Sequence, residues 1–521
     1  MHIYGVYELA FQCEDKSHDL DLKYQLLVDF TGPSGKHRSI PAYWNGGKTW
    51  YVRFSPDEPG IWNWQSRCID ALDNGLLRTG SLECLEYSGN NPLYLHGPLS
   101  VSSSGTHLVH ADGKPFFWLG DTAWSGVIRG DDANWKEYLQ YRRTQLFTVI
   151  QFVASNWRGA ENDEAGEQAY SSVNPLRINP EFFNRIDARV KMINDHDMIC
   201  APVILWAAKE SDTGNILSEE DATALAMYIY ARYDAYQTVW IPAGDGKYEG
   251  PKLEQWKRLC RKLFGFGHSR LATIHPCGLN WVGEDFHDEP WFSFNGYQSG
   301  HIDAQKDLTW HIQGPPALEW NNNPVKPVIN LEPNYETASG YANKTYFTDY
   351  HVRRAAYWSL MIGPPAGLTY GHDSIWNWNL ETGPSEGHGD WHKGNVPPWY
   401  TGLKSNGISS MTAMYRIFEN FDWTNMSPAP ELLGAQPGTD SPERYISAAA
   451  LNQDGTALFY SPCGNDIIID ENADISGPVI LVDPATGIAF KLSDDVPEQI
   501  TLPDSRDWLV VCGPGYDINN R

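Results

Sequence analysis

The stretch Lys326–Glu336, KPVINLEPNYE, decides the expected fold. Residues 328–331 form a short apolar run between two prolines, which is typical of a buried strand. Glu332 falls where that strand should end, and a loop with a second acid, Glu336, follows it. A carboxylate at the carboxyl end of a strand is how a (β/α)₈ barrel presents a catalytic group, although the stretch alone could equally be a surface loop.

From Pro115 onward, strand-like and helix-like segments alternate, which is the pattern of a parallel sheet or barrel. Helix-like segments with an apolar face or a clear start or stop lie at 179–197, after Ser218, at 350–362 and at 407–421. The strand-like segments are 115–121, 147–155, 199–207, 238–245, 270–276, 291–298, 327–332 and 367–372. These segments predict an α/β fold built on a closed (β/α)₈ TIM barrel. No GxGxxG follows a strand, which disfavours a dinucleotide-binding fold.

Short alternating strands flank this central region on both sides. Residues 1–95 contain YQLLVDF, TWYVRFSP and GIWNWQSRC between turn residues, and they predict an N-terminal β-sandwich. After a Pro-rich linker, residues 430–521 return to short apolar strands and predict a C-terminal β-sandwich. The expected domains are therefore 1–95, the barrel at 96–425, and 430–521.

The composition is acidic, with 39 Lys and Arg residues against 65 Asp and Glu residues and a net charge of −26. A nucleic-acid partner is not expected, because the phosphate backbone requires a basic patch. No stretch approaches the ~18 consecutive apolar residues of a membrane helix, and the amino terminus lacks the pattern of a signal peptide. We expect a soluble chain without a membrane partner, cytoplasmic as written, or periplasmic or secreted if the natural chain is longer. The oligomeric state stays open.

Two carboxylates stand at the ends of predicted strands, Asp245 after the fourth and Glu332 after the seventh. Glycoside hydrolysis needs two carboxyl groups facing one glycosidic bond, one to donate a proton and one to attack or stabilise the anomeric carbon. Strands four and seven lie on opposite sides of a barrel mouth, so their side chains can converge on one ligand. Asp245 could also be an ordinary turn residue, since Gly246 follows it.

Polar and aromatic residues gather at the other strand ends in a chain that holds 22 Trp and 27 Tyr. Aromatic rings can fill cores, or they can stack on sugar faces while neighbouring polar groups bind hydroxyls. Each residue alone could be a helix cap or a core residue, but together they predict a polyol-binding mouth. The candidate substrate-binding residues are Asp121, Trp124, Gln151, Trp157, Trp206, His275, Tyr297, Gln298, His301, Tyr335, Glu336, Tyr370, His372 and Trp376.

The sequence evidence for a metal site is weaker than that for a pair of catalytic carboxylates. The 8 cysteines contain no CxxC pair, which excludes a zinc ribbon, and the sequence does not decide whether any of them form disulfides. His388, Asp390 and His392 alternate in GHGDWHK as zinc ligands on an extended segment could. The same Gly-rich loop could instead lie over the barrel mouth and donate hydrogen bonds, so we predict no metal and no cofactor. No GxSxG motif indicates a serine nucleophile.

Five motifs resemble, in order and spacing, the apiosidase-like family of glycoside hydrolases: GKPFFWLGDTAW, WIPAGD, YQSGH, KPVINLEPNYE and GLTYGHDSIW. The resemblance covers residues 113–421 and implies a (β/α)₈ barrel of a large retaining clan, with its acid/base after strand four and its nucleophile after strand seven. TWYVRFSPDEPGIWNW resembles the β-sandwich that precedes such barrels. The C-terminal region is similar to a small sandwich that relatives carry under a collagen-binding label, which we do not adopt as a function.

By this resemblance, Asp245 matches the family's acid/base and Glu332 its nucleophile. Two departures lie nearby, since Ala243 stands where a second glycine is expected and Lys247 follows, and most of the clan has Glu rather than the shorter Asp245. We predict a retaining glycosidase that acts on a plant or microbial oligosaccharide or polysaccharide, with apiose as one candidate sugar. The alternatives are a non-catalytic carbohydrate-binding protein on a barrel scaffold and a metal-dependent hydrolase.

Overall fold

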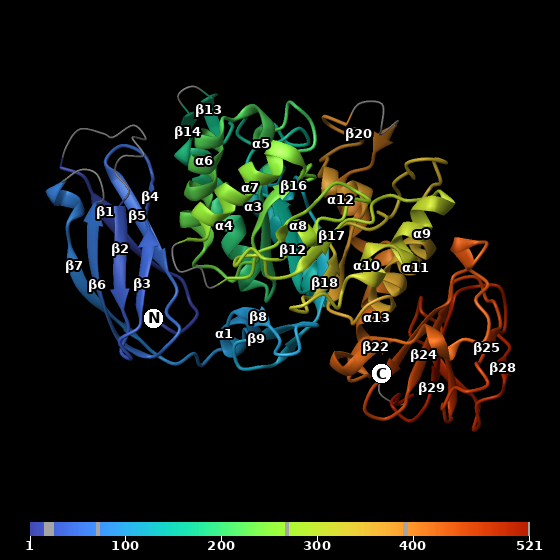
Figure 1. Cartoon of the computed structure of the whole chain (residues 1–521). Coiled ribbons are helices and arrows are strands. Elements are labelled where there is room, and N and C mark those ends of the chain that lie inside the picture. Colours follow the sequence, from blue (N-terminus) through green and yellow to red (C-terminus); the bar gives the residue numbers. More distant parts are fainter. Residues whose placement is uncertain (15–25, 69–72, 174–175, 266–269, 389–393, 519–521) are drawn as a thin grey trace.

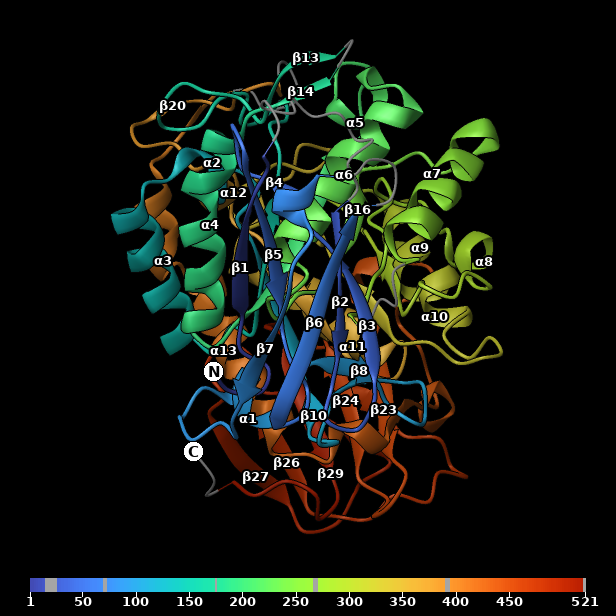
Figure 2. The same ribbon diagram turned by 90° about the vertical axis from the view of Figure 1, so that its left-hand side faces the viewer.

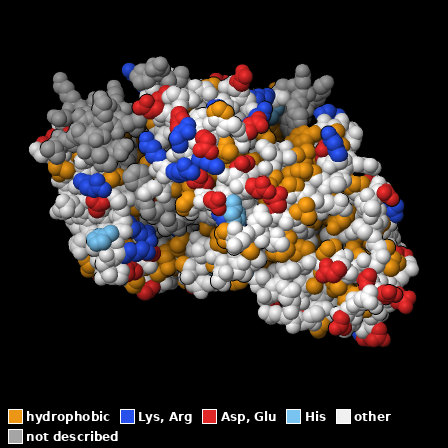
Figure 3. Space-filling view, viewed as in Figure 1, with side chains coloured by type: hydrophobic (Ala, Val, Ile, Leu, Met, Phe, Trp, Pro, Cys, Tyr) orange, Lys and Arg blue, Asp and Glu red, His pale blue; other side chains and the backbone are white. Residues whose placement is uncertain are grey.

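The computed structural model describes residues 1–14, 26–68, 73–173, 176–265, 270–388 and 394–518. Three groups of strands follow one another along the chain and occupy different regions of the molecule (Figure 1). The N-terminal sheets lie at one end, a parallel sheet with helices forms the middle, and the C-terminal sheets lie at the opposite end (Figure 1). Lys and Arg side chains are interspersed with Asp and Glu side chains on the central part of the face in Figure 3.

Two antiparallel sheets form the N-terminal group, and Figure 2 views them face on. Their facing sides enclose a separate apolar cluster that includes Phe11, Val28, Phe30, Val52 and Trp62. The strand orders are β1-β5-β4 and β3-β2-β6-β7. The strands are β1 (Tyr7–Gln12), β2 (Leu26–Thr31), β3 (His37–Pro41), β4 (Tyr43–Trp44), β5 (Thr49–Phe54), β6 (Gly60–Cys68) and β7 (Thr79–Cys84).

A short connecting unit joins this group to the central region. It consists of α1 (Pro92–His96) and a small antiparallel sheet in the order β10-β9-β8. Asn91 caps α1, because its side chain accepts a hydrogen bond from the Leu93 amide. The three strands are β8 (Leu99–Val101), β9 (Leu108–His110) and β10 (Pro115–Phe116).

The central region is a mixed α/β fold with a curled, parallel seven-stranded sheet in the order β16-β15-β12-β11-β19-β18-β17. Each of its strands overlaps a segment that the sequence predicts to be a strand, and only β11 extends past its predicted end, by one residue. β15 is buried along its whole length, as a parallel strand covered on both faces should be. The strands are β11 (Trp118–Thr122), β12 (Val149–Val153), β15 (Ile199–Trp206), β16 (Ile241–Gly244), β17 (Asn295–Tyr297), β18 (Val328–Asn330) and β19 (Gly367–Tyr370).

The predicted strand at 270–276 makes only isolated bridges, and it lies between the two edges of this sheet. Ala272 bridges Trp240 on one side and Phe292 on the other, both in parallel orientation. Toward β17, side chains replace part of the backbone ladder: the Ala272 amide donates to Ser293 Oγ at 3.1 Å, and Thr273 Oγ1 donates to the Phe294 carbonyl at 2.7 Å. These replacements explain why the segment is not a continuous strand.

Helices alternate with the strands along the chain, as predicted. α4 and α6 pack against β15, and α11 packs against β19. Ser218 opens α6 by accepting the Asp221 amide at 3.1 Å. The helices are α2 (Gly126–Arg129), α3 (Asp132–Thr144), α4 (Pro180–Asp195), α5 (Thr213–Ile216), α6 (Glu219–Tyr233), α7 (Gly250–Leu263), α8 (Gly283–Phe286), α9 (Gln305–Gln313), α10 (Pro315–Leu318), α11 (Asp349–Met361), α12 (Asp373–Asn377) and α13 (Asn406–Glu419). Two hairpins extend from the loops: β13 (Tyr170–Val173) with β14 (Leu176–Ile178), and β20 (Gly383–Pro384) with β21 (Asn395–Val396).

The C-terminal group is a six-stranded antiparallel sheet in the order β22-β23-β24-β29-β26-β27, with a two-stranded sheet of β25 and β28. Between them lies another separate apolar cluster, which includes Phe459, Val479 and Val510. The strands are β22 (Met426–Pro428), β23 (Ser447–Leu451), β24 (Ala457–Ser461), β25 (Ile467–Ile468), β26 (Val479–Val482), β27 (Ala489–Ser493), β28 (Gln499–Ile500) and β29 (Trp508–Cys512).

Buried ion pairs connect the outer groups to the central region. Arg53 of β5 pairs with Asp187 of α4 and donates to the Arg232 carbonyl at 2.9 Å. Arg353 of α11 pairs with Asp507, which precedes β29, at 2.7 Å. All eight cysteines are free thiols. None of the helices in the described ranges has the combination of length and apolarity that a membrane crossing requires.

Candidate active site

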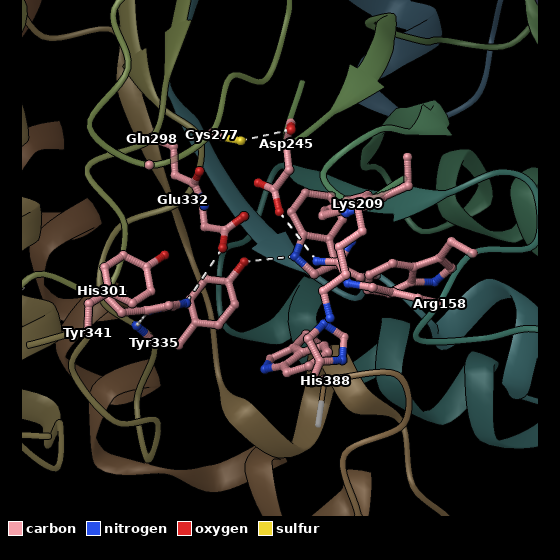
Figure 4. Close-up of a pocket in the computed structure, with 15 residues that line it drawn as sticks. Arg158, Lys209, Asp245, Cys277, Gln298, His301, Glu332, Tyr335, Tyr341 and His388 are labelled. Carbon is pink, nitrogen blue, oxygen red and sulfur yellow. Dashed lines mark hydrogen bonds and ion pairs between the residues drawn. The ribbon is translucent and has the colours of Figure 1, made fainter. Parts of the chain in front are cut away.

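A cavity of about 310 Å³ opens at the carboxyl ends of the parallel strands, beside the last residue of β15 and the loop after β16. This volume lies within the range of small-ligand pockets, about 300–1,000 Å³. Aromatic rings and a few charged groups share its wall (Figure 4). The lining residues are Trp124, Trp157, Arg158, Trp206, Lys209, Asp245, Cys277, Gly278, Gln298, His301, Glu332, Tyr335, Tyr341, Trp376 and His388.

The carboxylates of Asp245 and Glu332 converge in this cavity (Figure 4). Asp245 directly follows β16, and Glu332 lies two residues after β18. One carboxylate oxygen of each lies within 4.8 Å of the other. Their side chains are 17% and 8% exposed, so both are shielded from bulk water yet reachable from the cavity.

Two imidazoles flank the Glu332 carboxylate. His275 Nε2 lies 3.2 Å from Oε2, and His301 Nε2 lies 3.6 Å from Oε1. The Nδ1 atoms of the two rings accept backbone N–H groups, from Asp245 at 3.4 Å and from Tyr335 at 3.3 Å respectively. Because Nδ1 is an acceptor in both rings, each neutral ring carries its hydrogen on Nε2, the nitrogen nearer Glu332, although the 3.2 Å contact of His275 Nε2 with Oε2 lacks hydrogen-bond geometry.

The pKa values of the two carboxyl groups are shifted in opposite directions. Burial and the nearby negative charge of Glu332 raise the pKa of Asp245 to about 6. Burial also acts on Glu332, but the hydrogen bonds and charges of His275 and His301 outweigh it and lower the pKa of Glu332 to about 2. Burial opposes the charged form of His275, yet Glu332 raises the net pKa of this imidazole. Between these two carboxyl pKa values, the proton is on Asp245 and the negative charge is on Glu332.

Arg158 lies on the other side of Asp245. Its Nη2 is 3.6 Å from Asp245 Oδ2, and its Nη1 donates to Asp212 at 2.9 Å. The guanidinium lies over the rings of Trp157 and Trp206, at 5.5 and 5.4 Å from the ring centroids. Asp245 Oδ1 is buried without a hydrogen-bond partner within the described ranges. That oxygen faces the protein interior, 3.8 Å from His275 Nδ1.

Aromatic side chains from several loops form most of the apolar wall. Trp124 Nε1 donates to the Tyr335 hydroxyl at 2.8 Å, which fixes both groups at the cavity surface. The rings of Trp157 and Trp206 pack at 4.6 Å, and the indole Nε1 of each is buried without a partner in the part of the chain that is described. Indole rings at the cavity surface suit a ligand that has apolar faces.

A family model described as the apiosidase-like catalytic domain matches residues 102–425, which is more than half of the chain. The chain belongs to the apiosidase-like family. It is therefore a glycosidase, and the predicted resemblance to this family is confirmed. A second model, described as a domain of unknown function (DUF5060), matches residues 1–68.

Solved structures with the same fold accompany the family match. A glycoside hydrolase family 5 protein from Bacteroides vulgatus ATCC 8482 is 23% identical with a TM-score of 0.69, covering 81% of this chain and 94% of its own. A structure described only as a glycoside hydrolase is 23% identical with a TM-score of 0.70, covering 83% and 100%. A glycoside hydrolase structure from the same Bacteroides strain is 15% identical with a TM-score of 0.69, covering 98% and 99%. No protein of curated function matches the chain.

Half of the predicted substrate-binding residues of this apiosidase-like chain line the cavity. They are Trp124, Trp157, Trp206, Gln298, His301, Tyr335 and Trp376. The others lie behind the cavity wall or deeper in the sheet, and they are Asp121, Gln151, His275, Tyr297, Glu336, Tyr370 and His372. His275 stands immediately behind the two carboxylates and touches both.

Several of the deeper residues have partners within the protein. Asp121 pairs with Arg142, and both side chains are fully buried. Gln151 accepts from Thr369 at 2.7 Å and donates to the Leu331 carbonyl at 3.1 Å, which links strands across the sheet.

The remaining deeper residues also have internal partners. The Tyr370 hydroxyl and the Gly407 amide donate to Glu336. His372 caps α12 by accepting the Ser374 amide at 3.1 Å, and the Tyr297 hydroxyl lies 3.3 Å from the His311 ring.

Five lining residues were not predicted from the sequence: Arg158, Lys209, Cys277, Gly278 and Tyr341. Arg158 directly follows the predicted Trp157, and Cys277 lies two residues after His275, so proximity to a strand end was an available signal for these two. Lys209 and Tyr341 lie further along their loops, where no periodicity indicates which side chains turn inward.

The metal hypothesis has two possible sites. Asp390 and His392 of the GHGDWHK loop lie outside the described residues, and His388 lines the cavity beside Trp376. Within the described ranges, Asp245, His275 and Glu332 also have the spacing of a metal site. His275 fits this role poorly, because a ring nitrogen that carries a hydrogen has no lone pair for a metal ion. The three groups are better suited to holding and moving a proton.

Proposed function

We propose that this chain is a retaining glycosidase in which Asp245 is the acid/base and Glu332 the nucleophile. The observation that carries the proposal is the separation of less than 4.8 Å between their carboxylate oxygens. Retaining enzymes have carboxyl groups about 5–5.5 Å apart, whereas inverting enzymes need about 6.5–9.5 Å to admit a water molecule. The unequal pKa values support the same division of roles.

The reaction would proceed in two displacements. In the first, Glu332 attacks the anomeric carbon while Asp245 gives its proton to the glycosidic oxygen, so the aglycone leaves as an alcohol and the sugar is held as an ester of Glu332. In the second, Asp245, now a carboxylate, takes a proton from water, and the resulting hydroxide equivalent displaces Glu332 from the anomeric carbon. The released sugar keeps its configuration, and both carboxyl groups return to their starting state.

The substrate we propose is a plant or microbial oligosaccharide or polysaccharide. The cavity of about 310 Å³ has the size for one or two sugar residues, and its indole and phenol rings suit sugar faces. The family description names apiosidase, so apiose is the first sugar to test.

We also propose that the parallel sheet closes into a barrel and that a β-sandwich domain lies on each side of it in the chain. Segment 270–276 forms hydrogen bonds to both edges of the parallel sheet, which supports closure into a (β/α)₈ barrel. The separate apolar clusters of the outer sheets support β-sandwich domains at 1–95 and 430–521 around a barrel at 96–425.

The test uses Glu332→Gln and Asp245→Asn, which keep side-chain size and remove the charge. On a panel of 4-nitrophenyl glycosides and pectic oligosaccharides, Asp245→Asn should lose about 10²–10⁴-fold in kcat, the usual contribution of acid–base catalysis, and Glu332→Gln at least as much. Glu254→Gln, an exposed carboxylate on α7, is the matched control and should retain full activity. Wild-type turnover by either active-site variant would remove that residue from the mechanism. Oligosaccharide binding without turnover by the wild type would favour the non-catalytic alternative.

A further inference from the structure

Residues 275–277 hold the backbone of Asp245 from both sides. The Asp245 amide donates to His275 Nδ1 at 3.4 Å, and the thiol of Cys277 donates to the Asp245 carbonyl at 2.9 Å. Backbone bonds continue this pairing: the Gly246 amide donates to the His275 carbonyl at 3.2 Å, and the Cys277 amide donates to the Gly246 carbonyl at 3.3 Å. Figure 4 shows Cys277 directed at Asp245 from the neighbouring loop.

Asp245 needs such support because of its backbone conformation. Its φ angle is +49°, in the left-handed region, which is uncommon for residues with a side chain although Asp adopts it more often than most. Conformations of this kind persist when the surroundings fix them, and they concentrate at functional sites. Asp245 is also shorter than a glutamate by one methylene group, so the position of its backbone decides where its carboxylate can reach.

We infer that His275 and Cys277 are positioning residues, which hold the left-handed Asp245 so that its short side chain reaches the glycosidic oxygen opposite Glu332. This inference rests on the proposed function. We call the two side chains, with their bonds to the Asp245 backbone, the Asp245 clamp. Neither side chain is required to touch the substrate in this role.

His275 has a second partner, and the two roles of its ring can be separated. Nδ1 holds the Asp245 amide, while Nε2 faces Glu332 at 3.2 Å. The amide of a glutamine occupies roughly the place of Nε2, so His275→Gln keeps a donor toward Glu332 and loses the acceptor for Asp245. The amide oxygen of an asparagine occupies roughly the place of Nδ1, so His275→Asn does the reverse.

The experiment compares leaving groups, using the sugar that wild type cleaves fastest in a panel of 4-nitrophenyl pentosides and hexosides. A 2,4-dinitrophenyl leaving group departs without a proton, whereas a 4-nitrophenyl group benefits from one. Cys277→Ala and His275→Gln should lower kcat/KM for the 4-nitrophenyl glycoside by about 10- to 100-fold, the effect of a misplacement of about 1 Å, and leave the 2,4-dinitrophenyl glycoside within about twofold. His275→Asn should affect both substrates alike, because it acts on Glu332.

Two controls accompany these variants. Cys277→Ser keeps a donor to the Asp245 carbonyl and should recover most of the 4-nitrophenyl activity. Cys463→Ala removes another thiol-to-carbonyl bond, to Glu443 and far from the cavity, and should behave as wild type. Equal losses on both substrates in Cys277→Ala and His275→Gln, or no loss on either, would overturn the clamp.

Crystal structures of Cys277→Ala and His275→Gln give a readout that is independent of substrate. We expect the φ angle of residue 245 to leave the left-handed region or the Asp245 carboxylate to move away from Glu332, and an unchanged site would overturn the inference. Asp245→Asn separates the two proposals. If Asp245→Asn has wild-type rates, the proposed function fails; if it is inactive while both clamp variants match wild type, only the clamp fails.

Discussion

The carboxylates of Asp245 and Glu332 come within 4.8 Å of each other and share His275 as a neighbour, yet their other surroundings differ. Two imidazoles lie beside the Glu332 oxygens, at 3.2 and 3.6 Å, whereas burial and the charge of Glu332 both disfavour the ionised form of Asp245. This difference, rather than the residue types, determines which group keeps the proton. The two different pKa values predict that the activity depends on pH.

We predict that kcat/KM is bell-shaped in pH. Asp245 must be protonated to act as the acid, so activity should fall as the pH rises through about 6. Glu332 must be charged to act as the nucleophile, so activity should fall as the pH approaches about 2, provided that the fold survives. The measurement is kcat/KM across pH 2–9 on one aryl glycoside. A profile that is flat from pH 5 to 8 would contradict the assignment of Asp245.

The raised pKa of Asp245 also predicts a change in stability with pH. A group whose folded pKa is raised, here to about 6, stabilises the fold fully below its unfolded pKa of about 3.9, and that contribution is lost as the pH rises through 6. Asp245→Asn cannot ionise. Its free energy of unfolding should therefore exceed that of wild type by a margin that grows between pH 4 and pH 7, as measured by urea unfolding. A constant difference over this range would show that Asp245 titrates normally.

His301 provides a third prediction. His301→Ala removes one of the two N–H groups that face Glu332, so the pKa of Glu332 should rise and the acidic limb of the kcat/KM profile should move to higher pH. His301→Gln can keep an N–H group near the same position and serves as the control. A variant that lowers kcat without moving the acidic limb would mean that His301 contacts substrate instead of holding Glu332 charged.

The convergence of Asp245 and Glu332 in one cavity could be predicted from the sequence because it follows from chain geometry. Parallel strands bring their carboxyl ends to one edge of the sheet. Acidic residues at two strand ends therefore lie near each other, and the conformation of the connecting loops has little influence on this. The positions of Trp124, Trp157 and Trp206 follow from the same rule, and all three line the cavity. Sequence therefore locates groups that are within about four residues of a strand end.

Other features depend on contacts that no local pattern specifies. Gln151 and Tyr370 lie in or beside strands as predicted, but they turn toward partners inside the sheet, since a strand residue points to the interior or to the mouth according to register. Tyr341 reaches the cavity from a loop held by Asp303, which accepts the Ala342 and Asn343 amides, both at 2.9 Å. Segment 270–276 is predicted to be a strand. In the structure it is not a continuous strand, because the side chains of Ser293 and Thr273 replace some of the backbone–backbone hydrogen bonds to its neighbour.

The last prediction concerns the buried pair of Asp121 and Arg142, whose side chains are both fully buried. Tyr138 donates a hydrogen bond to the same oxygen, Asp121 Oδ2, at 2.6 Å, whereas Oδ1 has no hydrogen-bond partner among the described residues. Arg142→Met should lower the free energy of unfolding by about 3–5 kcal/mol, because it leaves a buried carboxylate without its partner. The control is Arg143→Met on the same helix, which breaks an exposed pair with Asp197 and should cost less than about 1 kcal/mol. Urea unfolding of the two variants measures both values. If Arg142→Met instead raises KM and leaves stability near that of the control, the Asp121 carboxylate acts on substrate, as its place at a strand end first indicated.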